Sequence, residues 1–155
     1  RVHVAYCFCA QACILEVDEN SGEVRVLKMI AAQDVGKAIH PQNIRGQIEG
    51  GVVMGMGYAL SEEFVVDKGY VITDTLRKCK VPRITQVPEI VPLIVENPHS
   101  EGPFGAKGMA ELSLASSAPA IANAIYHALG VRIRELPITP EKILAALHRT
   151  HATAK

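Results

Sequence analysis

Five glycines interrupt a helix-like segment in the first half of the chain and limit how that helix can pack. Residues 43–60 read NIRGQIEGGVVMGMGYAL, follow Pro41 and are predicted to form a helix that ends near Leu60. Each glycine inside a helix costs roughly 1 kcal/mol relative to alanine, so five of them require a reason. On a helical wheel Gly46, Gly50 and Gly57 fall within about 40° of one another and form a bare stripe. Another backbone or a flat ligand could approach such a stripe, and tight packing of the helix on a sheet explains it equally well.

A second glycine-rich segment, EGPFGAKGMAELSLASSAPAIANAI at residues 101–125, places a lone carboxylate before a helix. The apolar spacing predicts a largely buried helix over residues 113–129, whose regular part starts near Ser117 because Pro119 belongs in a first turn. Unpaired N–H groups at a helix start favour negative charge and would keep Glu111 ionised. An ionised carboxylate in a glycine-lined apolar site is a candidate general base. The alternative is that Glu111 only satisfies the helix dipole.

The glycines of this loop, at positions 102, 105 and 108, let the backbone come close to a ligand. Their N–H groups could donate hydrogen bonds to an anion. Lys107 could bind the same anion as a point charge, or could merely be solvated.

The remaining segments predict strands on either side of the glycine-rich helix. Residues 2–17 and 23–32 are rich in β-formers and are separated by the turn sequence ENSG, which indicates a hairpin. Residues 63–73 predict a second hairpin. Residues 90–95 predict a short strand that Pro92 confines to a sheet edge, and residues 131–136 predict another strand.

The end of the chain carries clear helix boundaries. Gly130 is the expected C-cap of the buried helix, while Thr139 and Pro140 are the expected N-cap and first residue of a last helix. The tail after about residue 148 is expected to be frayed. The order of elements predicts one α+β domain over residues 1–155, in which helices pack on a mostly antiparallel sheet.

The composition excludes several classes of partner. The 16 lysines and arginines balance 16 acidic residues, so a net charge of zero gives no electrostatic reason to bind nucleic acid or anionic lipid. Aromatic residues make up only 5% of the chain, which argues against base stacking. No apolar run approaches the roughly 18 residues of a membrane span, and Arg45, Gln47 and Glu49 exclude the glycine-rich helix from a bilayer.

The cysteines suggest a reducing compartment. Cys7, Cys9 and Cys13 have a spacing that resembles a metal site, but they lack a clear fourth ligand and lie in a strand-like apolar run. Buried free thiols, which pack as small hydrophobic groups, are the better interpretation. A cytoplasmic location is therefore expected.

Three consecutive blocks of the sequence carry a resemblance to a known family. They are IAAQDVGKAIHPQNIRGQIEGGVVMGMGYALSEE, KVPRITQVPEI and the EGPFGAKGMAELSLASSAPAIANAI segment. In order and spacing they resemble the C-terminal part of the molybdenum-binding large subunit of the xanthine dehydrogenase and aldehyde oxidase family. The resemblance covers about residues 10–147. The chain starts inside an apolar segment without a methionine, as expected of a piece of such a subunit.

The resemblance assigns roles to five residues. In this family the glutamate of a lysine-glycine-x-glycine-glutamate loop is the catalytic base beside molybdenum, and Glu111 matches it. The resemblance implies that Glu111 takes a proton from the hydroxide that attacks an electron-poor carbon of the substrate. Gln47 matches a residue that contacts the pterin of the cofactor, and Met109 matches a backbone contact to the cofactor. Lys107 and Gly108 complete the matching loop and are expected to bind the cofactor, and no protein ligand to the metal is expected.

Two positions depart from the family pattern. Ala110 replaces the usual glycine before the base, and Leu112 stands where proline is common. Because alanine does not easily adopt a positive φ, the loop could shift slightly. Neither change removes the carboxylate.

The resemblance also implies cofactors and partners. The cofactor would be the molybdenum cofactor, molybdopterin or its cytosine dinucleotide, with iron–sulfur clusters and FAD on other domains or subunits. The remaining portion of the molybdenum-binding subunit would be the direct partner. The activity would be an oxidoreductase that hydroxylates a purine, an aldehyde or an N-heteroaromatic with water as oxygen source. The alternative is a structural or degenerate domain without chemistry. The isolated chain is expected to be inactive and to self-associate.

Overall fold

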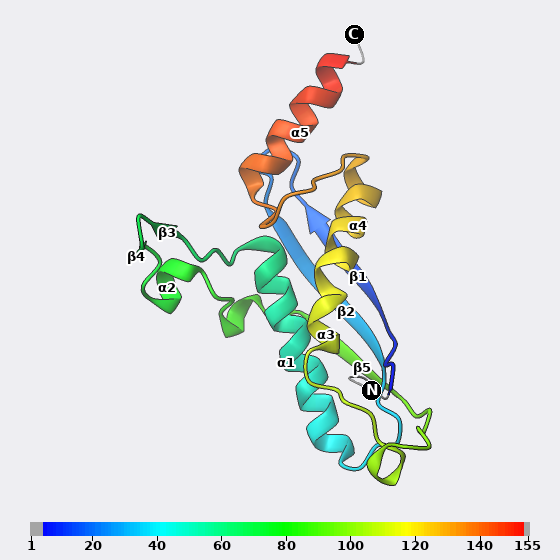
Figure 1. Cartoon of the computed structure of the whole chain (residues 1–155). Coiled ribbons are helices and arrows are strands. Elements are labelled where there is room, and N and C mark those ends of the chain that lie inside the picture. Colours follow the sequence, from blue (N-terminus) through cyan, green and yellow to red (C-terminus); the bar gives the residue numbers. More distant parts are fainter. Residues whose placement is uncertain (1–4, 154–155) are drawn as a thin grey trace.

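A computed structural model describes residues 5–153, with side chains through Thr150. Within this range a three-stranded sheet has the order β1–β2–β5, and β3 pairs with β4 in a separate two-stranded sheet (Figure 1). The strands are β1 (Cys9–Val17), β2 (Val24–Asp34), β3 (Val66–Asp67), β4 (Tyr70–Val71) and β5 (Glu89–Val95). The helices are α1 (Pro41–Leu60), α2 (Leu76–Cys79), α3 (Leu112–Ala115), α4 (Ser117–Leu129) and α5 (Pro140–Thr153), with 3-10 turns at Ile84–Gln86 and Pro103–Gly105.

The fold is α+β, as the sequence predicts, and its main sheet is mixed. β1 and β2 form the expected antiparallel hairpin, with a bulge between Ile14 and Leu15. β5 pairs with β2 in parallel, because α1 and the long segment after it carry the chain back to the starting end of the sheet. β5 is an edge strand, as expected from Pro92.

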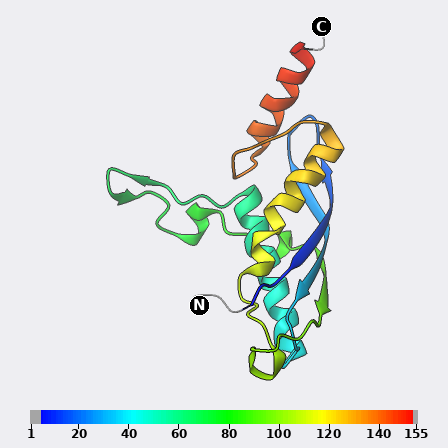
Figure 2. The ribbon, with the colours of Figure 1, turned by 45° about the vertical axis from the view of Figure 1, so that its right-hand side comes forward.

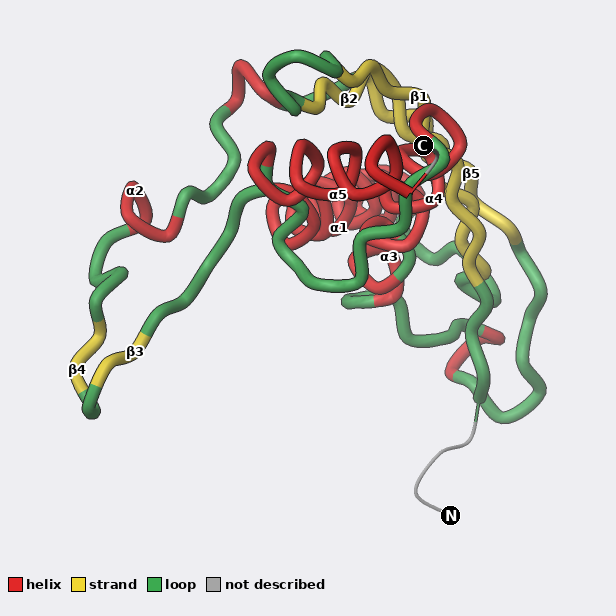
Figure 3. The backbone as a smooth tube through the Cα atoms, turned by 90° about the horizontal axis from the view of Figure 1, so that it is seen from above, coloured by secondary structure: helices red, strands yellow, loops and turns green. Residues whose placement is uncertain are grey.

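The helices cover one face of this sheet. α4 lies against β1, and α1 lies against β5 and β2, as Figures 2 and 3 show from two directions. Met29 of β2, Ile48 and Val52 of α1, and Ile121 and Ile125 of α4 are almost fully buried between these layers. The β3–β4 hairpin extends away from the layers on a long arm. No helix of residues 5–153 is long and apolar enough to cross a membrane.

Most predicted boundaries agree with the structure. The glycine-rich helix begins at Pro41 and ends at Leu60. The buried helix is regular from Ser117 and ends at Gly130, which has the left-handed conformation (φ 70°) of a C-cap. Residues 112–115 form a separate short helix, α3.

Three predictions need correction. Residues 131–136 form no strand; Val131 and Ile133 contribute apolar side chains to the core from an irregular connection. α5 remains helical through Thr153, past the fraying expected after residue 148, and residues 154–155 lie outside the described range. The first strand begins at Cys9 rather than near residue 2, and residues 1–4 also lie outside that range.

Close packing of α1 depends on two glycines that do not belong to the predicted stripe. A Cβ atom on Gly51 would collide with the hydroxyl of Ser113, and one on Gly55 would lie 2.5 Å from Cβ of Ser117 and 2.7 Å from the carbonyl oxygen of Leu114. Gly46 and Gly50, in contrast, have nothing within 4 Å of such an atom. The close approach is therefore to α3 and α4, while part of the predicted stripe is open.

A buried ion pair joins the sheet to the loop before α3. Nζ of Lys107 lies 2.6 Å from Oδ2 of Asp34, at the end of β2, and each side chain is only 5% exposed. The other carboxylate oxygen, Oδ1, accepts a hydrogen bond from the N–H of Gly36 (3.0 Å). Burial opposes ionisation of Asp34, but the hydrogen bonds from Lys107 and Gly36 outweigh it and hold the pKa of this carboxyl below its usual value.

We expect opposite effects from alanine at Gly55 and at Gly50. Gly55→Ala should destabilise the fold by about 1–3 kcal/mol, because the new methyl group forces α1 away from α3 and α4. Gly50→Ala is the matched control in the same helix, and it should stabilise the fold by up to about 1 kcal/mol because its Cβ enters open space. Urea unfolding measures both, and equal effects would contradict the packing described above.

We expect Asp34→Asn to lower the free energy of unfolding at pH 7 by about 3–5 kcal/mol, because it leaves the Lys107 charge buried and unpaired. Since the pKa of Asp34 is lower in the folded chain, its contribution is present above the unfolded pKa of about 3.9 and is lost as the pH falls below it. The difference between wild type and variant should therefore shrink as the pH falls from about 4 towards the lower pKa of Asp34 in the folded chain. Asp67→Asn, at the exposed end of β3, should change stability by less than about 0.5 kcal/mol. If the difference in unfolding free energy between wild type and Asp34→Asn did not change with pH, the ion pair would not be the cause of that difference.

Candidate functional site

The loop that carries Glu111 is attached to the segment following β2. The N–H of Lys107 donates to the carbonyl of Val35 (3.0 Å), and the N–H of Lys37 donates to the carbonyl of Gly105 (2.8 Å). Gly36 pairs with Ala106 between these two bonds. Gly36 has φ +67°, and a Cβ atom there would collide with the Gly105 carbonyl, so only glycine suits this position. The loop thus continues the sheet beyond its regular strands.

Two side chains, one from the segment just before β1 and one from β2, hold the next carbonyl groups of the loop. The thiol of Cys7 donates to the carbonyl of Gly108 (3.1 Å), and Nε2 of Gln33 donates to the carbonyl of Met109 (3.2 Å). The N–H groups of Gly108, Met109 and Ala110 make no hydrogen bond with residues 5–153. Because Gly108 and Ala110 are exposed, a run of hydrogen-bond donors remains available to a ligand.

Glu111 presents a free carboxylate at the end of this run. It occupies the N-cap position of α3, but its side chain makes no capping hydrogen bond, and the residue is exposed. α3 has only four residues, so its helix dipole is small and attracts a negative charge only weakly. The structure therefore gives little support to a pure capping role.

Gln47 lies beside the same loop. It is exposed on α1. Ser113, two residues after Glu111, donates a hydrogen bond from its hydroxyl to the backbone carbonyl oxygen of Gln47 (3.4 Å). The open positions Gly46 and Gly50 are its helix neighbours. The structure therefore places the backbone of Gln47 against α3, the short helix that begins directly after Glu111.

Lys107 has a different place from the one expected. Its ammonium group is neither solvated nor directed at an open site, because it is buried against Asp34. Its N–H is also engaged, with Val35. In the structure Lys107 holds the loop through Asp34, and its expected contact with the cofactor stays a prediction.

The departures in the loop are accommodated without strain. Ala110 does not have a positive φ, so it adopts a backbone conformation that alanine tolerates. Leu112 is simply the first residue of α3. The Met109 side chain packs against the core, so a contact of Met109 with a ligand can use only its N–H.

Sequence reasoning missed the residues that support the site from behind. Gln33 is 1% exposed, and its Oε1 has no hydrogen-bond partner in the described structure. Gln11 of β1 donates to the carbonyl of Ser113 (2.5 Å) and accepts from the Ser117 hydroxyl (2.8 Å), which fixes the start of α3 and α4. A polar pair directly at the end of an apolar strand, as in Gln33 and Asp34, is the signal that could have drawn attention to them.

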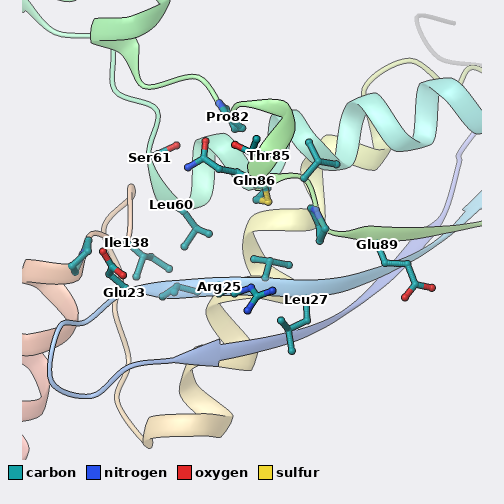
Figure 4. Close-up of a pocket in the computed structure, with 16 residues that line it drawn as sticks. Glu23, Arg25, Leu27, Leu60, Ser61, Pro82, Thr85, Gln86, Glu89 and Ile138 are labelled. Atoms are coloured by element: carbon teal, nitrogen blue, oxygen red, sulfur yellow. The ribbon is translucent and has the colours of Figure 1, made fainter.

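A sizeable pocket lies elsewhere in the molecule. It has a volume of about 650 Å³ and is bordered by Arg25 of β2, Leu60 of α1, Gln86 and Ile138 (Figure 4). None of the site residues expected from the sequence lines it. Among residues 5–153, no three His, Cys, Asp or Glu side chains are grouped so that they could hold a metal ion.

Comparison with known proteins identifies the family. Residues 1–88 match the family described as "Molybdopterin cofactor-binding domain". The chain is 38% identical over 135 residues to the probable hypoxanthine oxidase XdhD of Escherichia coli (strain K12), a match that covers 86% of this chain and 14% of that protein. It is 41% identical over 135 residues to the aldehyde oxidoreductase molybdenum-binding subunit PaoC of the same strain, covering 84% of this chain and 18% of that subunit.

Solved structures show the same similarity. The aldehyde oxidoreductase from Desulfovibrio gigas superposes with a TM-score of 0.83 at 38% identity, over 92% of this chain and 15% of that one. Quinoline 2-oxidoreductase from Pseudomonas putida 86 gives a TM-score of 0.82 at 34% identity, over 89% of this chain and 18% of that one. The chain thus spans less than a fifth of the length of these relatives. It belongs to the molybdopterin cofactor-binding domain family, as found in the large subunits of xanthine dehydrogenases and aldehyde oxidoreductases.

Proposed function

We propose that this chain forms one wall of the active site of a molybdenum hydroxylase and that Glu111 is its general base. The observation that carries the proposal is the free, exposed Glu111 carboxylate beside a run of unpaired N–H groups. A carboxylate that merely completed the fold would be expected to hold a partner, as Asp34 does.

The residues on this wall fit the molybdenum cofactor. Its pterin and phosphate groups are rich in hydrogen-bond acceptors, and the N–H groups of residues 108–110 are donors of the kind that bind them. The Gln47 amide can donate and accept on the same side. When bound, the cofactor would supply the oxidation itself and the transfer of oxygen from water.

The chain's own residues would position the reactants and move a proton. Gln47 and the backbone of residues 108–110 would orient the cofactor, while the Glu111 carboxylate would accept the proton released when oxygen is added to the substrate carbon. The Asp34–Lys107 pair would keep the loop in register with the sheet, so that the carboxylate stays within reach of that proton.

We propose as substrate an electron-poor carbon of a purine, an aldehyde or an N-heteroaromatic. This class is supported by the names of the relatives, which include a probable hypoxanthine oxidase, aldehyde oxidoreductases and quinoline 2-oxidoreductase. Iron–sulfur and flavin groups on other domains or subunits would carry the electrons away.

The wall is open on the side where a substrate would lie, because Gln47, Gly108, Ala110 and Glu111 are all exposed. We therefore propose that the remaining portion of the large subunit closes the site and that the isolated chain is inactive.

A cytoplasmic location is part of the proposal and is supported by four free cysteines. Burial raises the pKa of Cys13 to about 11, so this thiol stays protonated at neutral pH.

We expect Glu111→Gln, in the complete enzyme, to lower kcat by roughly 10²–10⁴-fold with little change in KM, because the amide cannot accept the proton. The measurement is the rate of substrate-driven reduction, normalised to molybdenum content. Glu101→Gln is the matched control, since Glu101 is exposed in the same loop and should leave the rate unchanged. Reduction of the Glu111→Gln variant at the wild-type rate would place the base elsewhere.

We expect Gln47→Ala to act on cofactor content rather than on chemistry. The variant should contain less molybdenum and pterin per subunit, while turnover per bound molybdenum stays closer to wild type, because the amide contacts the cofactor outside the reacting atoms. Gln42→Ala, an exposed glutamine in the first turn of the same helix, should retain full cofactor content. A Gln47→Ala enzyme with full molybdenum would remove Gln47 from the binding surface.

A further inference from the structure

The main sheet has two apolar faces, and helices cover only one of them. Gln11 and Cys13 of β1, Met29 and Ala31 of β2, and Ile90 and Ile94 of β5 belong to the face under α1 and α4. No helix of residues 5–153 lies over the opposite face (Figures 2 and 3).

The strand pairings define the composition of this outer face. One end is polar: Glu16 lies opposite Arg25, and the next row contains Ile14, Lys28 and Glu89. Beyond that row the outward residues are apolar, first in the row Ala12–Ile30–Val91 and then in the row Ala10–Ala32–Leu93. In the last row Asp34 pairs with Val95, and its carboxylate is neutralised by Lys107. We call the six residues of the two apolar rows, together with Phe8 and Val95 at the end of the sheet, the outer apolar half-face.

The outer apolar half-face is accessible in the described structure. Phe8 is 69% exposed, Leu93 47% and Val95 45%, and Ala10 and Ala12 are also exposed. A sheet with one solvated face alternates apolar and polar residues along each strand, whereas strands buried on both sides are apolar almost throughout. The sequences AQACI in β1 and IVPLIV in β5 resemble strands that are buried on both sides. The pattern therefore indicates a covered surface.

The half-face is continuous with the support of the candidate site. The N–H of Asp34 donates to the carbonyl of Phe8 (2.9 Å), and the N–H of Val35 donates to the carbonyl of Val95 (3.0 Å). Asp34 holds Lys107 and hence the loop of Glu111. Whatever covers this half-face also packs against the base of that loop.

We propose that the remaining portion of the molybdenum-binding large subunit docks on the outer apolar half-face. The proposal rests on the proposed function. The matched relatives are more than four times as long as this chain, so most of the subunit is available to cover it. A surface whose nearest carboxylate, Asp34, is already paired and buried resembles a permanent interface, which is typically as apolar as a domain core cut in half.

The charges at the border of the half-face agree with a permanent contact. Nζ of Lys28 lies 2.8 Å from Oε1 of Glu89, so these charges neutralise each other within the chain. No charged side chain of the half-face remains to steer a transient partner, which distinguishes it from surfaces that use charge complementarity for rapid association.

The first test compares side-chain oxidation by hydroxyl radicals in the 155-residue chain alone and in the complex with the remaining portion of the large subunit. We expect the oxidation of Phe8 and Leu93 to fall by about ten-fold or more on assembly, as in the dry centre of an interface. Tyr70, at the tip of the arm and 76% exposed, provides an internal reference for dose. Unchanged oxidation of Phe8 and Leu93 in the complex would overturn the proposal. So would protection already complete in the isolated chain, because a second copy would then be the occupant.

The second test compares Ile30→Glu with Ile14→Glu. Both isoleucines point outward on adjacent strands, but Ile30 lies in the half-face, whereas Ile14 lies opposite Lys28 in the polar row. Co-expressed with the remaining portion, the Ile30→Glu chain should give about ten-fold less assembled complex, whereas Ile14→Glu should assemble like wild type. Equal assembly of the two variants would overturn the proposal. Circular dichroism of each isolated chain checks folding, and if Ile30→Glu fails to fold, the oxidation test decides.

Neither readout depends on turnover or on molybdenum. Loss of assembly in Ile30→Glu together with normal kinetics of Glu111→Gln would support the docking surface and refute the proposed base. Normal assembly of Ile30→Glu together with slow kinetics of Glu111→Gln would support the proposed base and refute the docking surface.

Discussion

Asp34 and Lys107 lie 73 residues apart in the sequence, and their charged groups meet where water hardly reaches. Such a pair contributes little net stability compared with apolar residues, but it strongly penalises any arrangement in which one partner is missing. It therefore acts as a positional constraint: the loop before α3 has one low-energy register on the end of β2. The hydrogen bonds of Val35, Lys37 and Gln33 to the same loop extend this single register to Met109.

A second constraint comes from the opposite side of the loop. Gly51 and Gly55 allow α1 to approach Ser113 and Ser117 closely, and this contact holds α1 against α3, which begins directly after Glu111. The polar atoms at this contact are satisfied by Gln11 from the sheet, so three layers meet at the start of α3. Glu111 needs no partner of its own because the groups around it are fixed independently.

The sequence predicted the α+β class, the limits of α1, the strand β5 and the regular part of α4, because each depends on local signals such as glycine caps, proline and apolar period. Features that depend on distant partners were not predictable. The helical wheel selected Gly46 and Gly50, but the packing uses Gly51 and Gly55, since the neighbouring helix could not be placed from one sequence. The apolar alternation of residues 131–136 buries Val131 and Ile133 without any strand beside them. The resemblance to a family points to Glu111, Gln47 and the loop, and these assignments stay predictions. The pairing of Lys107 with Asp34 joins segments 73 residues apart and has no signal in the sequence.

The separation of contacting residues along the chain has a consequence for how the molecule forms. Gln11 meets Ser113 across 102 residues, and Cys9 meets Ser116 across 107, whereas the β1–β2 hairpin and α1 need only local contacts. Closing such long loops costs entropy before any contact is made, and chains rich in them fold slowly. During synthesis, β1 and β2 leave the ribosome well before residues 105–117 exist, so the hairpin must wait for the segment that completes it. The carboxylate of Glu111 is then among the last groups to reach its place.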